Sequence, residues 1–394
     1  MALLMRVLLV ADVSAETVHG GAERMLVNHV RAIRAAGYEL TLLTRQPHPD
    51  AAERYDLGDG VVEHRLSFDG TRGMAGLRQL ARGAKAWWRH YRDRFDVVVA
   101  EQPFTIWALQ RAGCGLPRLQ VCHSFAHEEY ATRHGLDWSM RHRLTATAMR
   151  RLERRVYRTA SSMLVLSRYM QQRLESTFDI DRGRVAIAPG AVQMPSPMHA
   201  EARRDARMAL GWEGPVVITL RNLVPRTGVD MLVQSAAMLR YDFPGLRWCI
   251  VGTGPLMPSL QVLATDLGVA NRIEFAGYLE EEEVVWRMQA ADLFMLPTRS
   301  LEGFGLVTPE ANACGLPVVA TPVGANPEVV ASSPYNRLAA DISPEAMAEA
   351  TTDLLCNEVQ HAARQEGLRR HVAEHFGWAS HDEALIRQLK SVLR

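Results

Sequence analysis

The chain has too few cysteines, in too scattered an arrangement, to build a disulfide framework. Its 394 residues include five cysteines, an odd number, and no two of them form a CxxC pair. Such a set is typical of reduced thiols in a cytoplasmic protein. We therefore expect free cysteines and a cytoplasmic location.

Long apolar runs and a strong net charge are also missing. No apolar stretch reaches the ~18 residues that a membrane-spanning helix needs. The apolar opening at residues 1–10 is followed by Asp12 without a small-residue cleavage pattern, so we interpret it as a buried strand and not as a signal peptide. The formal net charge is only +1, which argues against nucleic acid as a partner.

What the chain does contain is an alternation of strand and helix patterns. Residues 5–13 form a strand pattern, Gly20-Gly21 opens a helix pattern that ends at Gly37, and residues 38–44 form the next strand. Further strand patterns cover residues 96–100, 119–122 and 162–166.

A second alternation follows a break at Pro189 to Pro197. Its strand patterns cover residues 215–220, 247–252, 272–277, 292–297 and 317–320. We therefore predict an α/β protein with two mostly parallel sheets. The predicted domains are residues 1–195 and 196–376, and a final helix at 377–394 is expected to pack back on the first domain.

Unusual residues follow the carboxyl ends of the strands in the second half. They are Arg221, Gly252, Gly254, Gly277, Tyr278, Glu302 and Gly303. Parallel sheets present these ends at one edge, where open α/β folds bind ligands. Because the Gly20-Gly21 turn has the same relation to its own strand, we expect a site between the two domains.

The segment Thr298 to Glu310, TRSLEGFGLVTPE, places carboxylates on both sides of a glycine-bearing loop. We expect Thr308 to cap the helix that follows and Gly315 to end it. A strand, a glycine-rich loop and a helix N-terminus together present N–H groups to an anion. Carboxylates beside such a site suit a ligand with both phosphates and hydroxyls, as in a nucleotide sugar.

Seven motifs occur in an order that resembles the family 4 glycosyltransferases of the GT-B fold, over nearly the whole chain. They are GGAER (20–24), VCHS (121–124), LVLSRYM (164–170), VGTGP (251–255), FAGYL (275–279), EGFGLVTPE (302–310) and PVGANPEVV (322–330). The resemblance implies two Rossmann-like domains that face each other across a cleft. It also implies retaining transfer of a sugar from a nucleoside-diphosphate sugar to a hydroxyl of a small-molecule, saccharide or lipid-linked acceptor.

The resemblance further implies that the reaction needs no cofactor and no metal, because arginines and a helix dipole neutralise the diphosphate. The family's basic pair aligns with Asn222 and Thr227, whereas this chain has Arg221 and Arg226, each one residue earlier. We expect these two arginines to clamp the diphosphate.

The remaining site residues are also implied by the resemblance. Glu310 would accept hydrogen bonds from the ribose hydroxyls and Glu302 from the sugar hydroxyls, and His123 occupies the position of the family's active-site histidine. Donor contacts are implied for Gly21, Gly252, Gly254, Tyr278, Gly303, Phe304, Gly305, Leu306 and Glu310.

Three alternatives stay open at this point. The fold also suits a nucleotide-sugar 2-epimerase or a non-catalytic nucleotide-sugar-binding protein. His123 and His127 have the spacing of half a zinc site, although no third ligand is suggested.

Two basic segments, residues 76–95 and 141–158, also allow two interpretations. The spacing of their apolar residues favours amphipathic helices with a core face and solvated arginines. The second interpretation is peripheral contact with the inner face of a membrane, which would suit a lipid-linked acceptor. The sugar, the nucleotide, the acceptor and the oligomeric state are not specified by the sequence.

Overall fold

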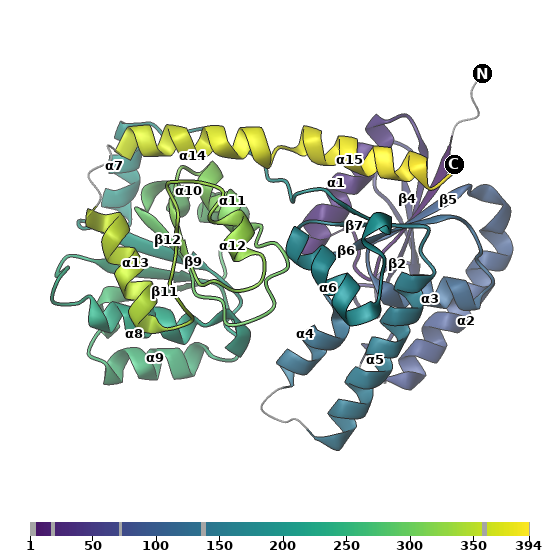
Figure 1. Cartoon of the computed structure of the whole chain (residues 1–394), viewed down its shortest axis with the longest axis horizontal. Coiled ribbons are helices and arrows are strands. Elements are labelled where there is room, and N and C mark those ends of the chain that lie inside the picture. The colour runs from purple at the N-terminus through teal and green to yellow at the C-terminus, as the bar shows by residue number, and fades with distance from the viewer. Residues whose placement is uncertain (1–4, 17–19, 71–72, 135–138, 357–360, 394) are drawn as a thin grey trace. The chain divides into compact units, whose positions relative to one another are not determined.

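A computed structural model describes residues 5–16, 20–70, 73–134, 139–356 and 361–393 of the chain. The chain divides into two compact units, which are shown in Figure 1. Unit 1 comprises residues 1–188 and 379–394, and unit 2 comprises residues 189–378. Residues 1–4 of the predicted opening strand lie outside the described part of the chain.

The predicted domain boundaries, after residues 195 and 376, differ from these divisions by a few residues. The segment after Ala188 packs on unit 2, where Val192 N donates to Phe376 O at 3.0 Å and the Arg369 guanidinium donates to Pro195 O at 2.7 Å. Because its backbone groups are bonded there, this segment belongs to unit 2.

Unit 1 is built on an eight-stranded sheet with the order β3-β4-β2-β1-β5-β6-β7-β8. The strands are β1 (Arg6–Val10), β2 (Glu39–Arg45), β3 (Arg54–Asp56), β4 (Val62–Leu66), β5 (Val97–Ala100), β6 (Arg118–Cys122), β7 (Ser162–Val165) and β8 (Val185–Ile187). Every pair is parallel except β3 with β4. The central strands are buried on both faces, which is why their sequences are continuous apolar runs.

Helices cover both faces of this sheet. They are α1 (Gly21–Ala35), α2 (Met74–Tyr91), α3 (Pro103–Arg111), α4 (Ala126–Arg133), α5 (Met140–Arg158), α6 (Arg168–Phe178) and α15 (Trp378–Ser391), with short 3-10 turns η2 (Arg92–Arg94) and η4 (Arg182–Arg184). Helices α2, α3, α5 and α6 pack on one face, and α1 and α15 pack on the other. The last helix, α15, contributes Ala384, Leu385 and Leu389 to this second core.

Unit 2 has a six-stranded, all-parallel sheet with the order β11-β10-β9-β12-β13-β14. The strands are β9 (Val216–Leu220), β10 (Arg247–Val251), β11 (Ile273–Gly277), β12 (Leu293–Leu296), β13 (Val318–Ala320) and β14 (Arg337–Leu338). The prediction of two mostly parallel sheets is confirmed.

The helices of unit 2 also lie on both faces of its sheet. They are α7 (Ala200–Ala209), α8 (Val229–Met238), α9 (Met257–Asp266), α10 (Glu281–Ala290), α11 (Val307–Ala313), α12 (Asn326–Val329), α13 (Pro344–Cys356) and α14 (His361–His375), with turns η5 (Pro225–Thr227) and η6 (Ala270–Arg272). One core lies under α8, α9 and α13, and the other lies under α7, α10 and α11.

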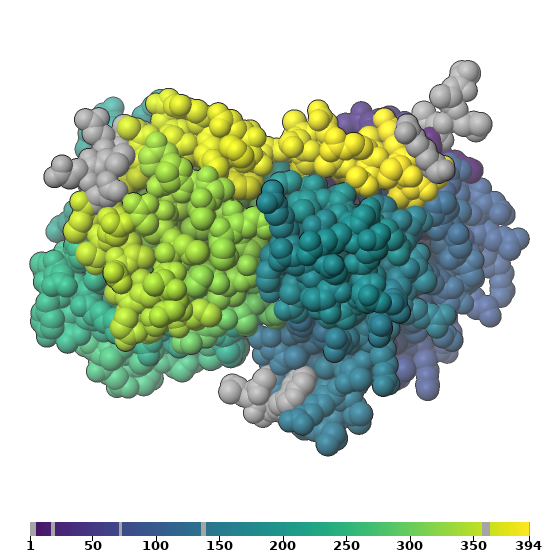
Figure 2. Space-filling model, in the orientation of Figure 1, coloured from purple at the N-terminus to yellow at the C-terminus, as the bar shows by residue number. Residues whose placement is uncertain are grey.

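Figure 2 shows that α14 and α15, drawn in yellow, each present an outer face at the surface. Among the described helices, none combines the length and the hydropathy that crossing a bilayer requires. All five cysteines are free thiols.

We expect Leu385→Ala in α15 to lower the free energy of unfolding of unit 1 by about 2–5 kcal/mol, because Leu385 is fully buried and its truncation leaves a cavity. Leu144→Ala in α5 is the matched control, since Leu144 is 65% exposed. Denaturant unfolding followed by circular dichroism measures both. Equal losses in the two variants would contradict the packing described for α15.

Candidate functional site

Five loops of unit 2 leave the carboxyl edge of its sheet and are joined to one another by hydrogen bonds. The bonds run from Gly252 N to Gly277 O (2.7 Å), from Leu223 N to Thr253 O (2.9 Å), from Arg299 N to Arg226 O (2.8 Å) and from Ala325 N to Glu302 O (2.9 Å). They connect the loops after β11, β10, β9, β12 and β13, which is the order of the strands in the sheet. The expected gathering of strand-end residues is therefore observed within unit 2.

Three side chains from two of these loops form a buried polar cluster. The Arg221 guanidinium donates through one terminal nitrogen to Thr298 Oγ1 at 2.8 Å and to Glu302 Oε2 at 3.1 Å, and Thr298 donates to the same Oε2 at 3.0 Å. The Arg221 and Glu302 side chains are only 10% and 11% exposed. Arg221 Nε is buried and has no hydrogen-bond partner among the described residues. A buried cation with an unsatisfied donor is suited to an anionic ligand.

The two residues that align with the family's basic pair have other functions here. The hydroxyl of Thr227 is buried and donates to the carbonyls of Asn222 and Val224, at 2.8 and 2.7 Å. Asn222 itself is exposed. Arg226 lies in η5, and its carbonyl holds the loop after β12. Arg221 is thus the cation that the fold places beside Glu302.

The loop after β12 is conformationally unusual on both sides of Glu302. Leu301 has a φ of 61° and Gly305 a φ of 80°. A left-handed conformation costs a leucine of the order of 1 kcal/mol and persists where the surroundings impose it. This strain lies next to the carboxylate that binds Arg221.

The predicted cap of the following helix is wrong. Helix α11 begins at Val307 with Leu306 at the N-cap, so Thr308 lies inside its first turn and its buried hydroxyl has no partner among the described residues. The cause is Gly305, whose left-handed turn lets its carbonyl accept from Thr308 N at 2.9 Å. Gly315, with a φ of 80°, follows the end of the helix as expected.

Glu310 is the one residue of α11 that is not buried. Part of the Glu310 side chain or backbone is therefore accessible to solvent. The side chains of Phe304 and Leu306 pack closely on the backbone of Gly190. A Cβ at Gly190 would lie 2.6 Å from Phe304 and 2.7 Å from Leu306. Phe304 is buried, whereas Leu306 and Gly303 are partly exposed.

The two predicted donor-binding glycines after β10 allow the loops to approach each other. Gly252 has a φ of 123°, and a Cβ there would lie 2.0 Å from Arg221 O. A Cβ at Gly254 would lie 2.4 Å from Leu223 O. Tyr278 follows β11 and is 64% exposed, so its ring is accessible.

The other two predicted residues belong to unit 1. Gly21 is the first residue of α1, and His123 directly follows β6. The His123 ring bonds through Nε2 to Glu101 Oε2 at 2.8 Å, and the second oxygen of Glu101 bonds to His29 Nδ1 at 2.6 Å. Burial alone would raise the pKa of Glu101, but the charges of His29 and His123 outweigh burial and hold that pKa below its usual range.

Sequence reasoning missed Glu101, although a signal was present. Glu101 directly follows the buried strand β5, in the same relation as Arg221 to β9. A charged residue at a strand end could have been included on that ground. Its partners His29 and His381 lie inside helices and carry no such signal.

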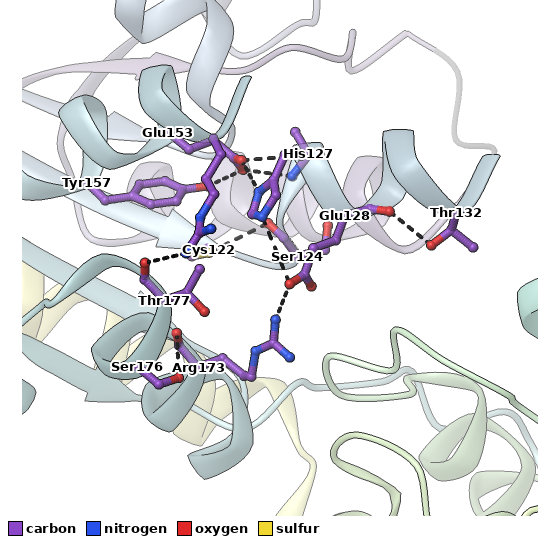
Figure 3. A network of polar contacts seen from close by, with 12 residues as sticks. Cys122, Ser124, His127, Glu128, Thr132, Glu153, Tyr157, Arg173, Ser176 and Thr177 are labelled. Carbon is purple, nitrogen blue, oxygen red and sulfur yellow. Dashed lines mark hydrogen bonds and ion pairs between the residues drawn. The ribbon is translucent and has the colours of Figure 1, made fainter. Parts of the chain in front are cut away.

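The segment after His123 is anchored by a second buried carboxylate, shown in Figure 3. Glu153 accepts from Ala126 N at 2.7 Å, from His127 N at 3.2 Å and from His127 Nδ1 at 2.6 Å, and so caps the start of α4. His127 is thereby used in a structural contact. Among the described residues, no three His, Cys, Asp or Glu side chains are grouped to hold a metal ion.

Both halves of the chain match family models of glycosyltransferases. Residues 19–194 match the family model Glycosyltransferase Family 4, and residues 203–370 match Glycosyl transferases group 1. The GDP-mannose-dependent alpha-(1-6)-phosphatidylinositol monomannoside mannosyltransferase of Mycolicibacterium smegmatis is 33% identical over 265 residues, which cover 65% of this chain and 68% of that protein.

Solved structures of glycosyltransferases match almost the entire chain. Sucrose-phosphate synthase from Thermosynechococcus elongatus has a TM-score of 0.82 at 19% identity, over 98% of this chain and 99% of its own. Anabaena HepE in complex with UDP has a TM-score of 0.74 at 18% identity, over 98% and 100%. The predicted GT-B fold is confirmed.

We expect Gly324→Ala to reduce the affinity for a nucleotide-sugar donor by about tenfold or more, because a Cβ there would lie 2.1 Å from Glu302 O and would displace the Arg221–Glu302 cluster. Gly268→Ala is the matched control: its φ is 70°, close to the 62° of Gly324, but a Cβ meets nothing within 4 Å. Calorimetric titration with a panel of nucleotide sugars measures the difference. Equal affinities in the two variants would show that the glycine contributes only through its backbone conformation.

Proposed function

Because the chain belongs to the family 4 glycosyltransferases, we propose that it transfers a mannosyl group from GDP-mannose to a hydroxyl of an inositol-containing lipid, with retention at the anomeric carbon. Transfer from a nucleotide sugar follows from the family. The donor and the acceptor are inferred from the mycobacterial relative, whose name states both. The observation that carries the site is the buried Arg221–Thr298–Glu302 cluster.

The cluster fits the charge changes of the reaction. The bond between the sugar C1 and the diphosphate oxygen breaks, and negative charge develops on the leaving diphosphate. The unsatisfied Nε of Arg221 can bind a phosphate oxygen in a site where water is largely excluded, and fixed charges are most effective there. Arg226 supplies a second cation from the same connection.

Glu302 has two tasks in this proposal. Its Oε2 accepts from Arg221 and Thr298, and its Oε1 has no hydrogen bond among the described residues. We assign Oε1 to the hydroxyls of the transferred sugar and Glu310 to the ribose hydroxyls. His123 would contact the reacting sugar, and the backbone of Gly21, Gly303 and Gly305 would contact the donor.

The acceptor oxygen attacks C1 on the face from which the diphosphate leaves, and its proton passes to the leaving phosphate oxygen. Neither a metal ion nor a cofactor is part of this proposal, since Arg221 and Arg226 provide the positive charge. The relatives named above are transferases and lend no support to the 2-epimerase alternative.

A basic surface on unit 1 supports an acceptor that resides in a membrane. The core face predicted for residues 76–95 is confirmed, because Leu80, Ala84 and Phe95 are buried and Trp87 and Tyr91 pack partly buried on the same core. The exposed bases are Arg78, Arg82, Lys85 and Arg89 on α2 and Arg141, Arg143, Arg150, Arg151, Arg154, Arg155 and Arg158 on α5. Both helices pack on the same face of the sheet, with α3 in contact with each of them (Figure 1).

The N-terminal part of α5 adds exposed apolar side chains to these charges. Met140 and Leu144 are 69% and 65% exposed and lie one turn apart. The only acid of α5, Glu153, is fully buried. Apolar residues among arginines suit the headgroup region of an anionic bilayer. We therefore place the enzyme in the cytoplasm, bound at the inner face of a membrane.

We expect GDP-mannose to raise the melting temperature of the protein, and Glu310→Ala to weaken this donor by roughly tenfold to a hundredfold through the loss of charged hydrogen bonds. Glu349→Ala, at an exposed position of α13, is the control. Unaltered donor affinity and turnover in the Glu310 variant would exclude its proposed role. If only UDP sugars stabilise the protein, the proposed donor is wrong, whereas the proposal of glycosyl transfer from a nucleotide sugar still holds.

We expect the protein to co-sediment with vesicles of phosphatidylcholine and phosphatidylinositol and not with phosphatidylcholine alone. Arg151→Gln with Arg155→Gln should weaken this binding by about 1 kcal/mol for each lost charge. Arg204→Gln with Arg247→Gln, two exposed positions of unit 2, is the control pair. Equal binding by both double variants would contradict a membrane contact through α5.

A further inference from the structure

A continuous chain of four polar side chains, three of them buried, runs from His123 to helix α15. His123 Nε2 lies 2.8 Å from Glu101 Oε2, Glu101 Oε1 lies 2.6 Å from His29 Nδ1, and His29 Nε2 lies 2.9 Å from His381 Nε2. The four residues come from the end of β6, the end of β5, α1 and α15. Glu101, His29 and His381 are each no more than 1% exposed.

Buried groups that can carry charge, such as Glu101, His29 and His381, are unusual in a protein interior. A buried carboxylate between two imidazoles must be desolvated, and apolar side chains of similar volume would fill the space without that cost. Charged residues lie close to His29 and His381 in the same two helices. Arg31 of α1 and Asp382 of α15 form an ion pair at 3.0 Å. The interface between α1 and α15 therefore holds specific polar groups as well as apolar ones.

The hydrogen bonds determine which ring nitrogens carry protons. An ionised carboxylate only accepts, so Nε2 of His123 and Nδ1 of His29 both donate to Glu101. One proton lies between the two Nε2 atoms of His29 and His381, whose rings are within 6° of parallel. In a neutral His123 ring that donates to Glu101 through Nε2, Nδ1 is the nitrogen that accepts.

We propose that Glu101, His29 and His381 are positioning residues, which hold His123 in the Nε2-protonated tautomer and in a single ring orientation. Glu101 acts directly on His123, and His29 and His381 fix the other oxygen of Glu101. The last helix thus supplies a side chain that the site requires, in addition to its packing. This inference rests on the proposed function for the part that His123 plays with the donor.

Glu101→Gln tests the direct contact with almost no change in shape. A glutamine presents one donor and one acceptor to the two histidines, so it cannot accept from both rings. Histidine-selective nitrogen NMR, with His123→Gln to assign the signal, should show Nε2–H at His123 in the unaltered protein and loss of that tautomer in Glu101→Gln. An unchanged tautomer would overturn the proposal.

Steady-state kinetics with GDP-mannose compare Glu101→Gln with the unaltered protein. We expect Glu101→Gln to lower kcat by about tenfold or more, with little change in KM for the donor, because the geometry of one site residue changes and the donor contacts of unit 2 do not. An unchanged kcat would also overturn the proposal. If the unaltered protein turns over no nucleotide sugar, the proposed function fails, while the tautomer measurement still decides whether Glu101 sets the state of His123.

His381 tests the contribution of α15. His381→Gln keeps an amide near the position of Nε2 and should retain kcat and the His123 tautomer, whereas His381→Leu should lower kcat and allow the His123 signal to average between tautomers. Leu385→Ala is the control, because it weakens the packing of the same helix and leaves the polar chain intact. Equal kcat values for His381→Leu and Leu385→Ala, compared at equal folded fraction, would show that His381 acts only through stability.

Discussion

The organisation of unit 2 depends on one constraint, that the backbone groups of five adjacent loops are bonded to one another. Polar backbone groups withdrawn from water must find partners, and here each loop finds them on its neighbour. Glycines make this possible where a side chain would collide, as Gly252 does against Arg221 O and Gly324 against Glu302 O. The positions of Arg221 and Glu302 follow from this arrangement, because Arg221 N donates to Val251 O at the end of β10 and Glu302 O accepts from Ala325 N in the loop after β13.

The two units solve a similar electrostatic problem in different ways. In unit 2 the buried carboxylate of Glu302 is balanced by a permanent cation, Arg221, which leaves a donor for a ligand. In unit 1 the buried carboxylate of Glu101 is balanced by imidazoles, whose charge depends on the protons that they share. The first arrangement suits the stable charge of a diphosphate, and the second suits control over a single proton.

Apolar run length decided how much of this could be predicted. The central strands of both sheets were found because burial on both faces makes them continuous apolar segments. Strands β3 and β4 were missed, since β4 carries Glu63, His64 and Arg65 within five residues. The cap at Thr308 was predicted wrongly because the turn at Gly305 depends on tertiary contacts that local preference does not contain. The strand-end residues of unit 2 were located correctly, but the pairing of Arg221 with Glu302 required two loops that are far apart in the sequence.

Unit 1 is formed by two segments, residues 1–188 and 379–394, which are separated in the sequence by all of unit 2. This order affects how the protein folds during synthesis. The core of unit 1 includes Leu385 and Leu389, which leave the ribosome after every residue of unit 2. Unit 2 can complete its own core while the face of the first sheet beneath α15 is still exposed to water. Nascent chains with such an open apolar face are prone to association, so biogenesis of this enzyme should depend on chaperones until α15 has been synthesised.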